Sequence, residues 1–289
     1  MQGPEIAEVI NEAAAGLRPA AASTVPKIVG QLSTSTVHRT ARNMSSTLIF
    51  GATGGIGSQV LARLLERGTP CIAVVRDEAR LPQAYRKGHP LLETVVMPDG
   101  HLTMEDATLE EHLARCNSVV SCIGHNMTFK GLFGRASRDL CVETTRRVCE
   151  AIRKNAPASP IRYVVVSTEG VSRPDGLDPK LRGAAERLVL RLLELLLPPH
   201  LDNVKNAAYL HREVSGDTNT FVDFCAVRPS DLLDGEETLY ALHERLQNGI
   251  FNAGKTTRAN VGCFMADLIT KSDVWAEWKG KWPHILDVP

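Results

Sequence analysis

The sequence predicts an α/β fold, a doubly wound parallel sheet with helices on both faces and a small C-terminal lobe from about residue 170. Three observations support this prediction. Apolar runs typical of strands alternate with helical patterns between residues 47 and 227. These runs are continuously apolar, which indicates that both faces of each strand are covered. The first run leads into a turn with glycines at positions 51, 54 and 57. Such strand–helix alternation is typical of a parallel sheet.

Length and composition are those of an ordinary globular protein. Of 289 residues, 43% are hydrophobic and 23% are charged, and the formal net charge is zero. This balance indicates neither a nucleic-acid nor a membrane partner. The apolar runs are also shorter than the roughly 20 residues that cross a bilayer. The seven cysteines lack paired short spacing, so we expect no metal site and a reducing, cytoplasmic location.

The first 45 residues differ from the rest. They are rich in Ala, Ser and Thr. After Glu12, the next acidic residue of the chain is Glu66. This composition resembles a transit peptide, although three glutamates in the first twelve residues count against that interpretation. Met44 stands directly before the first strand and is an alternative start. We therefore expect residues 1–45 to be a disordered, targeting or non-native extension, with mitochondrial import as the alternative location, and residues 46–289 to be the folded domain.

The first strand, its glycine turn and the helix after it form the start of a dinucleotide-binding βαβ unit. Residues 47–50 are an apolar run, and residues 56–65 carry an apolar stripe at helical spacing. Glycine permits positive φ and close approach of a ligand, and a helix N-terminus directs N–H groups at a phosphate. The sequence therefore predicts a Rossmann-type site whose cofactor-binding residues here are Gly51, Thr53, Gly54, Gly55, Ile56 and Gly57.

Further elements follow along the chain. Strands are predicted at residues 71–75, 92–97, 118–122, 161–167 and 221–227, and helices at residues 108–115, 138–154, 183–197, 203–214 and 260–271. The helix at 183–197 is rich in leucine and has a wide apolar face. We expect this helix to be buried against the sheet, and the alternative is a helix that binds a partner.

The end of the second strand indicates which nucleotide binds. An acidic residue there would accept hydrogen bonds from the ribose 2′-hydroxyl of NAD, whereas an arginine suits the 2′-phosphate of NADP. Arg76 occupies this position, and Asp77 follows it. We predict NADP(H), with Arg80 as a possible second phosphate contact. A register shift of one residue would favour NAD(H), which is the alternative.

Several motifs together resemble one family. They are Gly-Ala-Thr-Gly-Gly-Ile-Gly at 51–57 and the segments 74–77, 119–124, 164–171 and 226–234, with 257–261 and 278–283 near the end. They resemble the atypical short-chain dehydrogenases of the NmrA-like, biliverdin-reductase-B-like NAD(P)-binding family, and the last two segments resemble its fungal branch. The resemblance implies an NADP(H)-dependent oxidoreductase that reduces a small carbonyl, enone or quinone-like compound in secondary metabolism. The alternatives are a nucleotide-binding regulatory protein without turnover and a redox-neutral isomerase.

The resemblance also implies roles for two loops. Ile123 and Gly124, after the fourth strand, should lie beside the ribose on the nicotinamide side of the cofactor. His125 either faces the substrate or has no role. The family usually has an acidic residue near the adenine after the third strand. Here His101 stands at that position and Asp99 lies two residues earlier, so adenine contact by either residue stays open.

Ser167 and Thr168 are the predicted catalytic residues. They follow the fifth strand, at the edge where parallel sheets bind ligands, and would hydrogen-bond a substrate carbonyl. The alternative is that these hydroxyls cap backbone groups. The Tyr–Lys pair of standard short-chain dehydrogenases is absent at Tyr209, because Glu213 occupies the lysine position. We expect a small-molecule substrate, and the oligomeric state stays open.

Further side chains have open roles. His211 is either a proton donor or an ordinary half-buried histidine. Asp202 or Asn203 is a candidate N-cap for the helix predicted near residues 203–214.

Overall fold

The computed structural model describes residues 45–86, 88–125, 138–178, 181–215 and 219–288. The predicted extension at residues 1–45 therefore lies, apart from its last residue, outside the described part of the chain.

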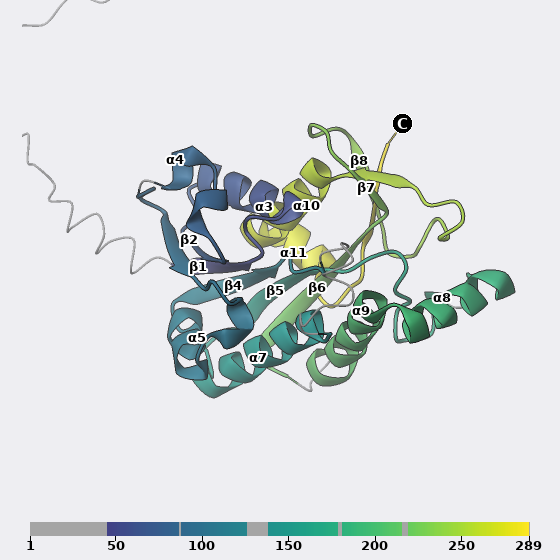
Figure 1. The fold of residues 1–289 in the computed structure, drawn as a ribbon, viewed down its shortest axis with the longest axis horizontal. Coiled ribbons are helices and arrows are strands. Elements are labelled where there is room, and N and C mark those ends of the chain that lie inside the picture. The colour runs from purple at the N-terminus through teal and green to yellow at the C-terminus, as the bar shows by residue number, and fades with distance from the viewer. Residues whose placement is uncertain (1–44, 87, 126–137, 179–180, 216–218, 289) are drawn as a thin grey trace, which may run out of the picture.

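An eight-stranded sheet runs through the molecule (Figure 1). Its strands are β1 (Ser46–Phe50), β2 (Cys71–Val75), β3 (Leu92–Val96), β4 (Cys116–Ser121), β5 (Ile161–Val166), β6 (Val222–Pro229), β8 (Tyr240–His243) and β10 (His284–Asp287). The spatial order is β3-β2-β1-β4-β5-β6-β10-β8, and the paired strands are parallel except for β10 and β8. The first six strands have the order of a Rossmann dinucleotide-binding sheet. The predicted fold class is confirmed.

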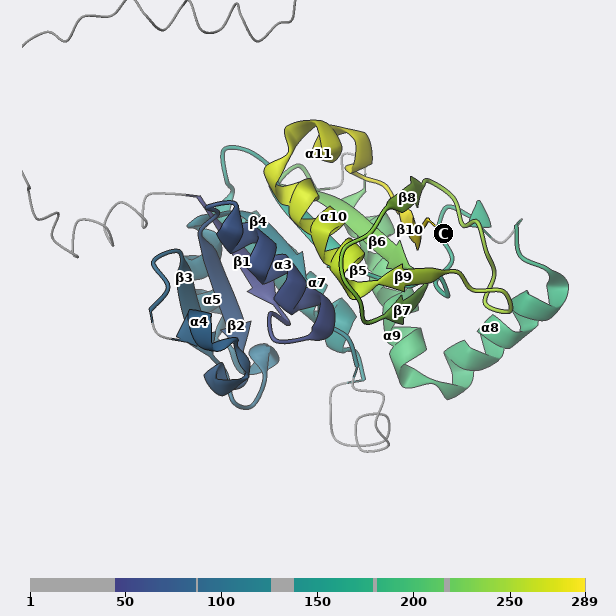
Figure 2. The same ribbon diagram turned by 90° about the horizontal axis from the view of Figure 1, so that it is seen from above.

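Helices cover both faces of the sheet (Figures 1 and 2). One face carries α3 (Gly55–Glu66), α10 (Arg258–Thr270) and α11 (Ser272–Trp278), and the other carries α5 (Asp106–Leu113), α7 (Leu140–Asn155) and α9 (Pro198–Tyr209). Successive strand residues point to opposite faces, so Ile49 enters the core beneath α3 while Leu48 and Phe50 enter the core beneath α7. This double cover explains why the strands are apolar along their whole length.

The structure adds elements that the sequence pattern does not predict. They are β8, β10 and a separate two-stranded sheet of β7 (Asp231–Leu233) and β9 (Lys255–Thr257), as well as α4 (Gln83–Arg86) and α11. Strands of three or four residues are too short for their apolar residues to show a clear spacing in the sequence. The helix predicted at 203–214 begins earlier, as α9, and continues into a π-helical turn, η4 (Leu210–Val214).

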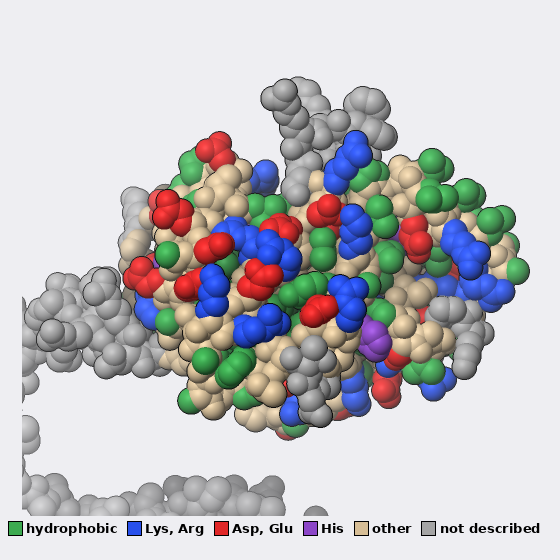
Figure 3. All heavy atoms as spheres, turned by 90° about the horizontal axis from the view of Figure 1, so that it is seen from below, with side chains coloured by type: hydrophobic (Ala, Val, Ile, Leu, Met, Phe, Trp, Pro, Cys, Tyr) green, Lys and Arg blue, Asp and Glu red, His purple; other side chains and the backbone are tan. Residues whose placement is uncertain are grey.

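The leucine-rich helix α8 (Ala184–Leu196) does not lie against the sheet. It packs on α9, and its buried residues are Glu186 and Leu190. Leu188, Leu195 and Leu196 are 61%, 80% and 72% exposed. Figures 1 and 2 show α8 projecting from one end of the molecule, and Figure 3 shows hydrophobic side chains gathered at that end. The expectation of burial against the sheet is wrong, because an apolar helical face does not itself determine which element covers it.

In the described parts of the chain, none of the helices combines the length and apolar character needed to span a bilayer.

Candidate functional site

A cleft of about 460 Å³ opens at the edge where the parallel strands end. Most of its lining residues follow four neighbouring strands: Gly51, Thr53 and Gly54 after β1, Arg76 and Arg80 after β2, Pro98, Asp99, Gly100, His101 and Leu102 after β3, and Cys122, Ile123, Gly124 and His125 after β4. Val74 and Val75 of β2 and Leu140 of α7 complete the lining. Parallel sheets bind ligands at this edge. The cleft thus brings together six of the predicted cofactor residues, whereas Gly55, Ile56 and Gly57 form the first turn of α3 beside it.

The glycine turn is packed so tightly that larger residues would not fit. Gly51 has a φ of 79°, and a Cβ atom there would lie 2.6 Å from the carbonyl oxygen of Cys122. A Cβ atom on Gly57 would lie 2.1 Å from the carbonyl oxygen of Gly51. The N–H group of Gly54 donates to that same oxygen at 2.9 Å, which closes the turn. The spacing of the glycines therefore reflects backbone packing between β1, β4 and α3.

The N-terminus of α3 suits a phosphate group. Gly54 is its N-cap residue, so no side chain caps the helix, and the first turn has no acidic residue. Unpaired N–H groups and the positive end of the helix dipole favour an anion at this position.

Arg258, at the start of α10, adds a positive charge that sequence reasoning missed. A Cβ atom on Gly55 would lie 2.6 Å from its Cδ atom, and its guanidinium group pairs with Asp234 at 2.7 Å. Arg258 lies about two hundred residues after the glycine turn, so no local pattern links the two.

Two arginines lie at the other side of the glycine turn. Arg76 and Arg80 both line the cleft, and neither has an ion-pair partner within the described chain. The carboxylate of Asp77 instead accepts a hydrogen bond from the N–H group of Ala79 at 2.9 Å and caps the short helix η1 (Glu78–Arg80). The strand end therefore presents guanidinium groups to the cleft, and this arrangement fits a 2′-phosphate better than a ribose hydroxyl.

His101 lies at the same end of the cleft as Arg76. Thr144 Oγ1 donates to the carbonyl oxygen of Leu140 and therefore accepts from His101 Nε2, which is 2.6 Å away. The His101 ring packs on Phe50 with a centroid distance of 5.2 Å. Burial, and then the nearby positive charges of Arg147 and Arg76, lower the pKa of His101 from 6.5 to about 4. The imidazole is thus neutral near pH 7, and its contact with an adenine ring stays a prediction.

This lowered pKa should make stability depend on pH. Because the folded pKa is about 4 and the unfolded value is 6.5, the unfolded chain binds a proton that the folded chain excludes in this window. Stability should therefore fall as the pH falls from about 6.5 to about 4. We expect His101→Gln to lose less stability than the natural protein between about pH 7.5 and about pH 5, measured by urea unfolding. The exposed His211→Gln variant is the control, and equal losses in all three proteins would contradict this expectation.

His125 lies at the opposite end of the cleft and contacts a buried carboxylate. His125 Nε2 is 2.6 Å from Asp202 Oδ2, and the Asp202 side chain is completely buried. Asp202 also accepts hydrogen bonds from the N–H groups of Cys141 at 2.7 Å and Val142 at 3.0 Å. Asp202 lies inside α9, so it caps the N-terminus of α7 and not that of its own helix. Sequence reasoning missed this pair because its members are 77 residues apart.

Ser167 and Thr168 follow β5 but are not among the residues that line the cleft. Thr168 Oγ1 accepts a hydrogen bond from the N–H group of Gly170 at 3.3 Å, which is a capping contact. β5 is the neighbour of β4, with Val165 opposite Ser121, so both strands end at the same edge. The predicted catalytic role of Ser167 and Thr168 stays a prediction.

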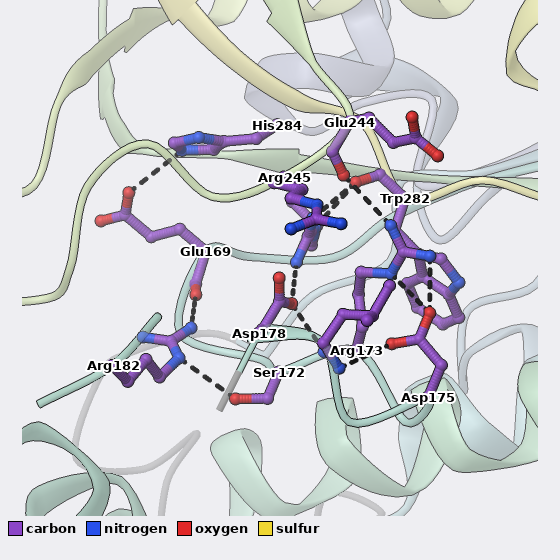
Figure 4. Close-up of polar contacts among 12 residues, drawn as sticks. Glu169, Ser172, Arg173, Asp175, Asp178, Arg182, Glu244, Arg245, Trp282 and His284 are labelled. Carbon is purple, nitrogen blue, oxygen red and sulfur yellow. Dashed lines mark hydrogen bonds and ion pairs between the residues drawn. The ribbon is translucent and has the colours of Figure 1, made fainter. Parts of the chain in front are cut away.

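A second group of polar side chains is buried beyond β5 and β6, and Figure 4 shows two of its members, Glu169 and His284, with the 3.4 Å contact between them as a dashed line. The N–H group of Gln247 donates to His284 Nδ1 at 3.2 Å, which leaves the imidazole proton on Nε2. His284 Nε2 is 2.8 Å from Ser230 Oγ, and that hydroxyl donates to Glu169. These contacts join the ends of β5, β6 and β10 and do not reach the cleft.

Comparisons with known proteins match the described fold. A family model described as NAD(P)H-binding matches residues 51–272. A search of curated proteins finds no match.

Solved structures with a similar fold include a short-chain dehydrogenase/reductase from Veillonella parvula in complex with NADP (TM-score 0.58, 15% identity, 84% of this chain and 94% of that chain covered). They also include ChuY, an anaerobillin reductase from Escherichia coli O157:H7 (TM-score 0.57, 16% identity, 84% and 97% covered). A third is the oxidoreductase ylbE from Lactococcus lactis (TM-score 0.58, 16% identity, 84% and 91% covered). At sequence identities of 15–16%, the similarity to these structures shows a shared fold and nothing more.

Proposed function

This chain belongs to the NAD(P)H-binding family, and on that basis we propose that it is an NADP(H)-dependent oxidoreductase that reduces a small carbonyl, enone or quinone-like compound. The observation that carries the proposal is the cleft that joins the glycine turn, Arg76 and the segment after β4. The cofactor supplies a hydride when it is bound. The glycine turn would hold its pyrophosphate and Arg76 its 2′-phosphate, so the nicotinamide would lie near Ile123 and Gly124.

The preference for NADP(H) is tested at Arg76. Arg76→Ala should weaken NADPH binding by about 1.5–3 kcal/mol, the range for a hydrogen bond to a charged group, and leave NADH binding nearly unchanged. Fluorescence titration of both nucleotides measures this difference. Arg153→Ala is the matched control, because Arg153 is an exposed arginine on α7 outside the cleft. Equal affinity of the natural protein for NADPH and NADH would contradict the assignment.

Reductase chemistry is supported by the similar fold of an anaerobillin reductase and of other oxidoreductases. The resemblance of segments 257–261 and 278–283 to a fungal branch supports a substrate from secondary metabolism. The test is NADPH consumption against a panel of small carbonyls, enones, quinones and flavins, with product analysis by mass spectrometry.

One observation favours a regulatory protein without turnover as the second candidate. The Tyr–Lys pair of standard short-chain dehydrogenases is missing, and Tyr163 is fully buried with its hydroxyl 2.8 Å from Thr145 Oγ1. Tight NADPH binding without consumption across the panel would support this candidate.

Within the reductase proposal, Ser167 and Thr168 contact and orient the substrate carbonyl. The support is their place after β5, beside the segment that follows β4. We propose a positioning contribution for these hydroxyls, and the proton must then come from another group.

A further inference from the structure

The end of the cleft away from Arg76 holds an imidazole with a fixed orientation. His125 lines the cleft, yet its side chain is only 5% exposed, because Asp202 contacts one edge of the ring. Nε2 is the nitrogen that faces Asp202. Within the described chain, Nδ1 has no hydrogen-bond partner.

Asp202 is itself held from two directions. It belongs to α9, and its two oxygens accept the N–H groups of Cys141 and Val142 in the first turn of α7. Those N–H groups lack partners inside their own helix, and the positive end of a helix dipole favours a negative charge. The carboxylate is therefore rigid, and a rigid carboxylate fixes both the orientation of an imidazole and the nitrogen that keeps its proton.

We propose that His125 is the proton donor of the reduction and that Asp202 is its positioning residue, an inference that rests on the proposed function. As the substrate carbon gains a hydride from the bound cofactor, the carbonyl oxygen takes a proton from Nδ1 of the His125 imidazolium. The N–H bond breaks, an O–H bond forms, and His125 is left neutral. Solvent then returns the proton, so that alcohol and oxidised cofactor are the products.

Other groups near this end of the cleft are less suited to the task. The atoms of His125, Cys141 and Asp202 that could bind a metal ion lie within 4.8 Å of one another. However, burial and the nearby Asp202 raise the pKa of the Cys141 thiol, and both oxygens of Asp202 are already occupied by α7. This arrangement favours hydrogen bonding over metal binding. His101, the other imidazole of the lining, lies at the Arg76 end of the cleft.

The kinetic test compares two kinds of variant. His125→Gln should lower kcat by about 10²–10⁴-fold, the usual contribution of a general acid, while the Kd for NADPH changes less than about twofold. The pH profile of kcat should differ between the natural enzyme and His125→Gln, because the variant lacks the proposed proton donor. The Ser167→Ala/Thr168→Val double variant is the comparison, because it should lower kcat and keep the pH profile of the natural enzyme. Normal turnover by His125→Gln, or an unchanged pH profile, would overturn the proposal.

A spectroscopic test works without turnover. Nitrogen-15 NMR of the protein alone should show His125 protonated at Nε2, with Nδ1 as the nitrogen that gains the second proton. Asp202→Asn should shift the ring toward the other tautomer, because an amide can donate to Nε2. A proton on Nδ1 in the natural neutral form would overturn the proposal. If the NMR result is as expected but no substrate is consumed, the proposed function fails while the His125–Asp202 geometry stands.

Discussion

Gly57→Ala should weaken NADPH binding by at least about 100-fold, which corresponds to about 2.7 kcal/mol. The new methyl group would lie 2.1 Å from the carbonyl oxygen and 2.8 Å from the carbonyl carbon of Gly51. Both are backbone atoms, so no flexible side chain can move aside. That oxygen also accepts the hydrogen bond that closes the glycine turn, so a shift of Gly51 would displace the N–H groups proposed to hold the pyrophosphate.

The matched control for this variant is Gly183→Ala. Gly183 precedes α8, and a Cβ atom there has no neighbour within 4 Å. Isothermal titration calorimetry with NADPH measures the affinity, and thermal unfolding shows whether the variant still folds. If Gly57→Ala folds and binds NADPH as tightly as Gly183→Ala does, the glycine turn is not the pyrophosphate site.

Arg228→Ala should lower the free energy of unfolding by about 3–5 kcal/mol, the usual cost of removing one partner of a buried ion pair. Arg228 and Asp178 form an ion pair in which both side chains are completely buried. Nε and Nη2 of Arg228 also donate to the carbonyl oxygen of Trp282, at 2.9 and 2.7 Å. The variant would leave the Asp178 carboxylate in the core with the N–H group of Arg173 as its remaining described donor.

Two further variants separate the buried charge from other effects. Lys154→Ala breaks an exposed ion pair with Glu110 and should change stability little. The double variant Arg228→Met/Asp178→Leu removes both charges and should recover much of the loss. The midpoint and slope of guanidinium unfolding give the free energy of unfolding of all three variants. A loss in Arg228→Ala no larger than that in Lys154→Ala would show that this buried pair does not stabilise the fold.

The sequence by itself determined the parts of the molecule whose signals are local. Three local signals lie within about twenty residues: the apolar run before Gly51, the spacing of the three glycines and the apolar stripe of α3. Each of them predicts the local structure of its own segment. Arg76 was also predictable as a cleft residue, because the residue after a parallel strand must lie at the C-terminal edge of the sheet. The fold class and the half of the cleft that we propose binds the phosphates follow from such local patterns.

Only the tertiary structure decided what depends on contacts between distant segments. The place of Asp202 in the chain suggested a cap for its own helix, and the packing of α9 beside α7 makes it a cap for another helix and a partner of His125. The leucines of α8 indicated a buried helix, yet no sheet within the described residues covers them. Arg258 lies beside Gly55 only because α10 packs on α3 in the folded chain. Periodicity and turn residues specify an element and its apolar side, whereas the partner of each side chain depends on the packing of the whole chain.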